Sequence, residues 1–227
     1  MFNHLNILIK TAIIIALFIF FLFFSALWYF STGLPDYKKL EVYEPPVSSR
    51  VYSENGELIA EYAIEKRLFV PYDAIPKLII NAFLAAEDKN FFSHSGIDPQ
   101  GIIRATINNF KNIINDKRLQ GASTITQQVA KNFLLTNELS FKRKIKEAIL
   151  AFRIEKAYSK ERILELYLNQ IYLGSGTYGI AAASLEYFDK SVKELNYAEA
   201  ALLAALPKAP SKYNPFRFYE EAKLRRN

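Results

Sequence analysis

The sequence lacks cysteine altogether and has two histidines in 227 residues. The absence of cysteine excludes a disulfide framework, a thiolate zinc site and a cysteine nucleophile. The histidines, His4 and His94, are too few for a multi-histidine metal site. Charge is not scarce, because 23% of the residues are charged and 51% are hydrophobic, which excludes a disordered chain.

Acidic residues are fewer than basic ones, 23 against 29, which leaves a formal net charge of +6. A basic excess favours anionic partners, namely phosphates, a membrane surface or nucleic acid. Mean hydropathy is 0.00, high for a chain with this many charges. The chain is therefore expected to have two unlike parts.

The apolar part is an uncharged run near the amino terminus, TAIIIALFIFFLFFSALWYF. About twenty apolar residues span the hydrocarbon core as a helix, so we predict one transmembrane helix over residues 11–31, after a tail over 1–10. A cleaved signal peptide and a buried core helix fit less well, because the run is long, lacks a polar face and has no A-x-A site after it. Basic residues on its two sides nearly balance, so they do not fix orientation.

Residues 32–72 read as a proline-containing linker and a β-hairpin around Asn55-Gly56, a type I′ turn pair. From 73 to 227 the pattern is helical, and we expect one compact domain without further strands. One predicted helix runs from 160 to a stop at Gly174. Predicted helix N-caps are Asp98, Ser123 or Thr124, Ser140, Ser159 and Asn196.

Three groups of residues in this domain could carry chemistry. Glu87 and Asp88 follow an apolar helical face, where a partly desolvated carboxylate suits proton transfer, although solvated helix-end acids are the common alternative. Hydroxyl, amide and ammonium groups gather at a predicted helix start, where anions bind; they belong to Ser123, Thr124, Thr126, Gln128 and Lys131.

The third group is Arg143, Lys144 and Glu147, which share one helix face. The pattern is typical of a salt-bridged surface helix, or of a carboxylate among cations that suits a pyrophosphate, and alone it does not decide. Glu165 and Asn169 lie one turn apart on an apolar helix, so we expect them to hold neighbouring elements together, with substrate contact as the second interpretation. His94 is interpreted as a structural hydrogen-bonding residue.

Five segments in order resemble the motifs of the family-51 peptidoglycan glycosyltransferases, the glycosyltransferase module of class A penicillin-binding proteins. They are EDKNFFSHSGID, QGASTITQQVAKN, RKIKEAILA, ILELYLNQIYLG and AALPKAPSKYNP. The N-terminal span and the VYSENGELIAEY hairpin resemble the 1A type. The resemblance implies a mainly α, lysozyme-like domain with a small β-hairpin and one transmembrane helix.

The resemblance also implies an activity, the inverting polymerisation of lipid II into glycan strands with release of undecaprenyl pyrophosphate. Glu87 matches the general base and Glu147 the glutamate that assists the leaving pyrophosphate, directly or through a divalent cation such as Mg or Mn. Lys131, Arg143 and Lys144 match cations around the pyrophosphate, and region 102–119 matches a membrane-contacting segment. Other cleft positions matched are Asp88, Arg104, Ser123, Thr124, Gln128 and Asn132.

Implied partners are lipid II, the nascent glycan strand, the bacterial cytoplasmic membrane and proteins of cell-wall synthesis, with no nucleic acid. The tail is expected in the cytoplasm and the catalytic domain outside it. The chain has no Ser-x-x-Lys or Lys-Thr-Gly motif, so we expect it to be the front part of a longer protein that carries a transpeptidase module. A membrane-anchored muramidase and a lipid-binding scaffold are the rival interpretations.

Overall fold

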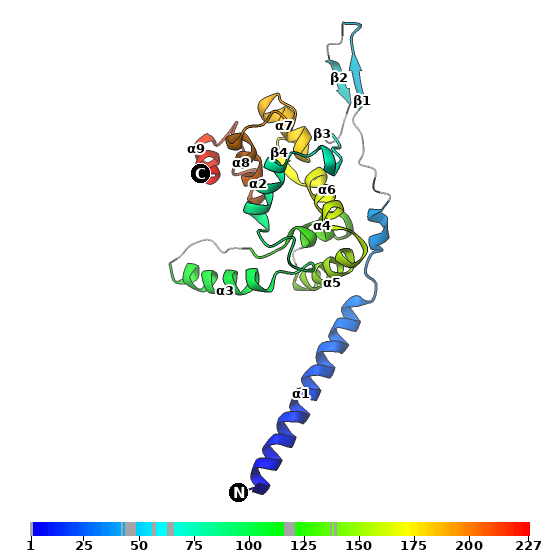
Figure 1. Cartoon of the computed structure of the whole chain (residues 1–227), viewed down its shortest axis with the longest axis vertical. Coiled ribbons are helices and arrows are strands. Elements are labelled where there is room, and N and C mark those ends of the chain that lie inside the picture. Colours follow the sequence, from blue (N-terminus) through cyan, green and yellow to red (C-terminus); the bar gives the residue numbers. More distant parts are fainter. Residues whose placement is uncertain are drawn as a thin grey trace.

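The computed structural model describes residues 2–41, 43, 49–55, 58–62, 66–115, 121–136, 138 and 140–227. The described part is mainly helical with two small sheets, which confirms the predicted fold class (Figure 1). Its helices are α1 (Phe2–Ser31), α2 (Lys77–Glu87), α3 (Pro99–Ile114), α4 (Ile125–Leu134), α5 (Phe141–Ala157), α6 (Lys160–Gln170), α7 (Ile180–Phe188), α8 (Tyr197–Ala205) and α9 (Tyr219–Arg226). Short 3-10 helices are η1 (Tyr37–Leu40), η2 (Tyr72–Ala74) and η3 (Leu206–Lys208).

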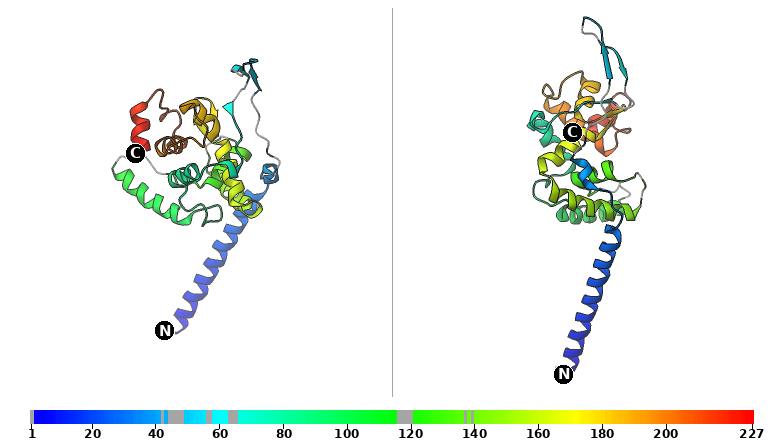
Figure 2. Two further views of the ribbon diagram at one scale, coloured as in Figure 1. Left: turned by 45° about the horizontal axis from the view of Figure 1, so that its top comes forward. Right: turned by 90° about the vertical axis from the view of Figure 1, so that its right-hand side faces the viewer.

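Helix α1 leaves the body as a single rod, and the β-hairpin projects from the opposite end (Figures 1 and 2). From Ile9 to Ser31, α1 is long and apolar enough to cross a membrane. Its last turn is tied to the body because the Arg153 guanidinium on α5 donates to the Ser31 hydroxyl. Helix α1 is therefore docked directly on one of the helices of the body.

The predicted hairpin is confirmed, with β1 (Ser49–Tyr52) antiparallel to β2 (Leu58–Tyr62). The second residue of its predicted turn, Gly56, lies outside the described residues. The linker before it is not extended throughout, because η1 docks on the body and buries Leu40. Its backbone is held there by side chains of later elements, since the Tyr158 hydroxyl donates to the Tyr37 carbonyl.

The core surrounds α6, in which seven consecutive residues from Ile163 to Asn169 are buried. Helices α2, α4 and α5 pack in this core together with α8. Such all-round burial explains why the polar residues of α6 needed partners. The Glu165 carboxylate accepts from the Tyr72 N–H at 2.7 Å, and the Asn169 amide bonds both backbone groups of Val70 at 2.8 Å. These contacts confirm the predicted structural role of both residues.

A second sheet contradicts the expectation of no further strands. Its order is β3 (Lys66–Arg67), β5 (Thr177–Tyr178) and β4 (Tyr172–Gly174), with β3 parallel and β4 antiparallel to β5. The prediction that a helix continues to Gly174 is therefore wrong, because α6 ends at Gln170 and the chain turns extended to pair with β5. Predicted N-caps are confirmed at Asp98, Thr124, Ser140, Ser159 and Asn196.

Candidate active site

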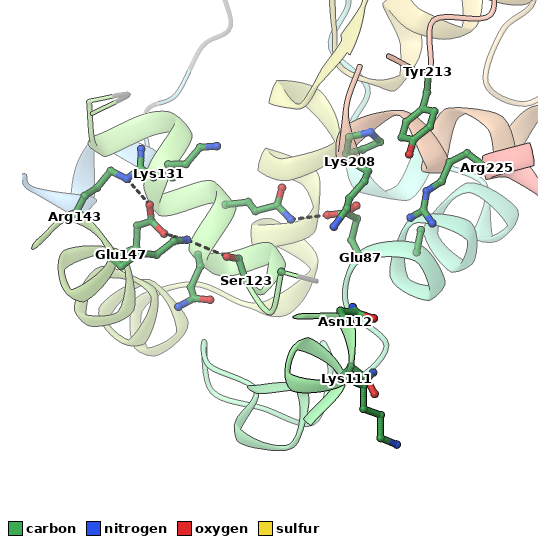
Figure 3. A pocket seen from close by; sticks show the side chains of 17 residues that line it. Glu87, Lys111, Asn112, Ser123, Lys131, Arg143, Glu147, Lys208, Tyr213 and Arg225 are labelled. Carbon is green, nitrogen blue, oxygen red and sulfur yellow. Dashed lines mark hydrogen bonds and ion pairs between the residues drawn. The ribbon is translucent and has the colours of Figure 1, made fainter. Parts of the chain in front are cut away.

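A cleft of about 730 Å³ opens between α2, α3, α4, α5, η3 and α9 (Figure 3). Six basic side chains and two acidic ones, Glu87 and Glu147, are among the residues that line it. A second hollow of about 460 Å³ shares Glu87, Ser123 and Arg225 with the first, so the two adjoin at Glu87. A cationic cleft of this size suits an anionic ligand larger than a single phosphate.

Glu87 is the last residue of α2 and is half-buried at the junction of the two hollows. The Gln128 amide on α4 donates to its carboxylate at 2.8 Å. Because the amide is neutral, it orients the carboxylate without the charge that an arginine or lysine partner would bring. Glu87 is thus a fixed carboxylate that faces open space and can accept a proton.

Asp88 has a different setting, although it is the next residue. Its buried carboxylate accepts from the Ile125 N–H at 2.9 Å and from His94 Nε2 at 3.0 Å. The Gly96 N–H donates to His94 Nδ1, so the proton of a neutral His94 is on Nε2, where it is donated to Asp88. Asp88 therefore lines the second hollow while it fixes the first residue of α4, and His94 has the structural role predicted for it.

The second acidic residue, Glu147, is buried within a cluster of cations (Figure 3). Lys144 Nζ contacts Glu147 at 2.6 Å and the Ser123 hydroxyl at 2.9 Å. Arg143 Nε lies 2.9 Å from the other Glu147 oxygen, but neither atom of that pair has a hydrogen-bond partner in the described structure. The structure thus brings together the Arg143, Lys144 and Glu147 side chains whose spacing placed them on one face.

Lys131 on α4 lines the same end of the cleft and has no ion-pair partner among the described residues. The cations that surround Glu147 therefore leave positive charge available to a ligand. This arrangement separates a half-buried carboxylate at one end from a cation cluster at the other (Figure 3).

A resident divalent cation fits this cluster poorly. Mg²⁺ and Mn²⁺ are bound by oxygen ligands, usually one or two carboxylates with further oxygens. Both oxygens of Glu147 face cations, Arg143 and Lys144, which would repel a metal ion. In the part of the chain that the structure describes, no group of three or more acidic or histidine residues could hold one. The divalent cation predicted at Glu147 stays a prediction, and no catalytic step is derived from it.

The remaining predicted site residues line the main cleft, the adjoining hollow or neither. Ser123 and Gln128 line the main cleft, and Arg104 and Thr124 line the adjoining hollow. The Thr124 hydroxyl is used structurally, since it donates to the Gly96 carbonyl at 2.7 Å and caps α4. Thr126 likewise donates to Glu155. Asn132 is not among the described residues that line either hollow.

Sequence reasoning missed several cleft residues from distant parts of the chain. Figure 3 shows Lys208, Tyr213 and Arg225 around Glu87, with Asn112 of α3 facing them and the Lys111 ammonium directed away. Lys208 and Tyr213 lie within the segment AALPKAPSKYNP, so the motif itself was a signal that could have found them. Nothing in the local pattern of α9 pointed to Arg225.

Comparison with known proteins shows the family to which the chain belongs. A model of the transglycosylase family matches residues 55–227. Penicillin-binding protein 1A of Rickettsia felis is 56% identical over 201 residues, covering 88% of this chain and 25% of that protein. Penicillin-binding protein 1A of Aquifex aeolicus is 54% identical over 215 residues, covering 95% of this chain and 29% of that protein.

A crystal structure of penicillin-binding protein 1A from Haemophilus influenzae matches with a TM-score of 0.40 and 27% identity over 81% of this chain and 17% of that one. By class, the described domain is a peptidoglycan glycosyltransferase. The chain belongs to the transglycosylase family, as its five motifs predicted. It spans about a quarter of the length of the Rickettsia relative and somewhat more of the Aquifex one.

Proposed function

We propose that the cleft polymerises lipid II by a single inverting displacement, with undecaprenyl pyrophosphate as leaving group. The observation that supports this is the pairing of a half-buried carboxylate, Glu87, with a cation cluster in one cleft. A sugar acceptor needs a base, and a pyrophosphate leaving group needs positive charge. A glycan leaving group, as in a muramidase, would not need the cations.

In the proposed reaction Glu87 takes the proton of the acceptor sugar's 4-hydroxyl. The hydroxyl oxygen forms a bond to the anomeric carbon of the donor as the bond from that carbon to the pyrophosphate oxygen breaks. Lys131, Arg143 and Lys144 stabilise the negative charge on the departing pyrophosphate. Glu147 holds Lys144 and Arg143 in place, since its buried carboxylate contacts both.

Polymerisation of lipid II by the chain in detergent or vesicles tests the proposal. Glu87→Gln should lower the rate by about 10²–10⁴, the usual contribution of a general base. Glu54→Gln, at an exposed position in the hairpin turn, is the matched control and should keep the wild-type rate. Cleavage of finished peptidoglycan without polymer would favour the muramidase, and unchanged activity in Glu87→Gln would refute the assigned base.

We also propose that the protein is a single-pass protein of the bacterial cytoplasmic membrane, with its amino terminus in the cytoplasm. Lipid-linked substrate then meets the body where α3, α5 and the end of α1 lie on the same side (Figures 1 and 2). Large apolar side chains are exposed along α3, which supports the predicted interfacial role of region 102–119 up to Asn115; residues 116–119 lie outside the described structure. They are Ile102, Ile103, Ile107, Phe110, Ile113 and Ile114.

Orientation can be read directly because the chain has no cysteine of its own. Lys212→Cys, in the body, should react with a membrane-impermeant maleimide in intact spheroplasts. Lys10→Cys, at the amino-terminal end of the span, should react after permeabilisation. The reverse pattern would overturn the proposed topology.

A further inference from the structure

Tyr167 is a buried tyrosine that the proposed reaction does not use. It lies on α6, is 1% exposed, and its hydroxyl has no hydrogen-bond partner in the described structure. A buried hydroxyl without a partner costs free energy, and phenylalanine would fill the same space without that cost. The hydroxyl therefore calls for a functional explanation.

Tyr167 packs against the part of α2 that leads to Glu87. Its ring contacts Phe83 edge-on, with centroids 6.3 Å apart, and Phe83 lies one helical turn before Glu87 on the same face. Burial, together with the negative charges of Glu87 and Asp88, raises the pKa of the Tyr167 hydroxyl well above its usual value. The hydroxyl thus stays protonated, and neighbouring carboxylates attract its proton.

Glu87 has more room than Asp88 for such a donor. Both oxygens of Asp88 already accept hydrogen bonds, from His94 and from the Ile125 N–H. Among the described residues, Gln128 is the one that donates to Glu87, and it does so to Oε2. Catalytic hydrogen bonds are often long in a free enzyme and tighten when substrate binds.

We propose that Tyr167 is a positioning residue whose hydroxyl donates to the Glu87 carboxylate in the substrate complex and favours its ionised form. This inference rests on the proposed function, in which Glu87 is the base. Together with Gln128, the hydroxyl would hold the carboxylate from the protein side and leave its open side to the acceptor sugar.

Other charged groups face Glu87 and stay the same when Tyr167 changes. Lys208 and Arg225 lie around it, and Lys111 of α3 lines the same cleft with its ammonium directed away from Glu87. The neighbouring Asp88 carboxylate contacts His94. The farther end of the cleft holds the cation cluster and Glu147, described above. Because a phenylalanine at position 167 alters none of these charges, a shift in pH dependence reports the hydroxyl itself.

The test is the pH–rate profile of lipid II polymerisation by wild type, Tyr167→Phe and Tyr187→Phe, together with their melting temperatures. Tyr187 is the matched control, because its hydroxyl donates to the Leu173 carbonyl at 2.9 Å and it is not among the residues that line the cleft. Tyr167→Phe should melt no lower than wild type, and its acid limb should move up by about 0.5–1 pH unit. On that limb the rate then falls about three- to tenfold, with the plateau retained.

Tyr187→Phe should show the opposite pattern, a lower melting temperature and an unchanged pH profile. An unshifted acid limb in Tyr167→Phe overturns the inference, and so does a melting loss as large as that of Tyr187→Phe, which would reveal a structural partner. A wild-type chain that makes no polymer contradicts the proposed function itself, and the inference with it.

Discussion

Replacing Asp88 by asparagine should destabilise the body, because both groups around this carboxylate are donors. The Ile125 N–H and His94 Nε2 each donate to it, at 2.9 and 3.0 Å. An amide has one oxygen to offer, so its NH₂ group must face one of the two donors. Both donors reach Oδ2, and His94 Nε2 also lies 3.1 Å from Oδ1, so an amide oxygen at the Oδ2 position sets the NH₂ group against the His94 N–H. Turned the other way, the amide leaves the Ile125 N–H without a partner, and either mismatch costs about 1–3 kcal/mol.

The substitution also removes a negative charge from the first turn of α4. A charge at a helix N-terminus contributes about 0.3–1 kcal/mol. Together the two effects give about 1–4 kcal/mol, or a melting temperature lower by roughly 3–15 °C for a domain of this size. Because α4 carries Gln128 and Lys131, polymerase activity should fall as well.

Differential scanning calorimetry of the chain in one detergent at one scan rate measures this change. Asp189→Asn is the matched control, since Asp189 is exposed and its φ of +54° is one that asparagine tolerates. It should melt as wild type does. If Asp88→Asn melts within about 2 °C of wild type, the reasoning about the two donors is refuted.

Three further outcomes follow from particular contacts. Glu147→Gln should lower both the polymerisation rate and the melting temperature, because it leaves Arg143 and Lys144 around an uncharged group. Glu87→Gln should lower the polymerisation rate alone, so equal melting temperatures of the two variants would contradict this reasoning. The Gly101 N–H holds the pKa of Asp98 below its usual range. The greater stability of wild type over Asp98→Asn should therefore be present above about pH 4 and vanish as the pH falls further. A difference in melting temperature that stays constant across about pH 3–7 in calorimetry would argue against this. Gly179→Ala should be less stable than Gly176→Ala. Both glycines have a positive φ, but a Cβ at Gly179 would lie 2.7 Å from the Asn169 carbonyl oxygen, whereas one at Gly176 would meet open space. Chemical denaturation should give the lower free energy of unfolding for Gly179→Ala.

The parts of this structure that the sequence predicted correctly depend on neighbours along the chain. A cap and its helix, or Lys144 and Glu147 three positions apart, need no knowledge of the rest of the fold. The second sheet could not be predicted without knowledge of the rest of the fold, because β3 pairs with β5 more than a hundred residues later. The strands are also too short to show an alternation of apolar and polar residues. Lys208 and Arg225 reach the cleft in the same way, through packing of α8 and α9 on the body.

The attachment of α1 to α5 also determines how far the cation cluster lies from the end of the membrane helix. Arg153, which holds Ser31, lies six residues from Glu147 on the same helix, or about 9 Å along its axis. A rigid rod thus connects the end of the membrane helix to the cation cluster. A bilayer that holds α1 would therefore fix the distance between its surface and the cation cluster. At that distance the cluster can bind a headgroup that is still attached to its lipid.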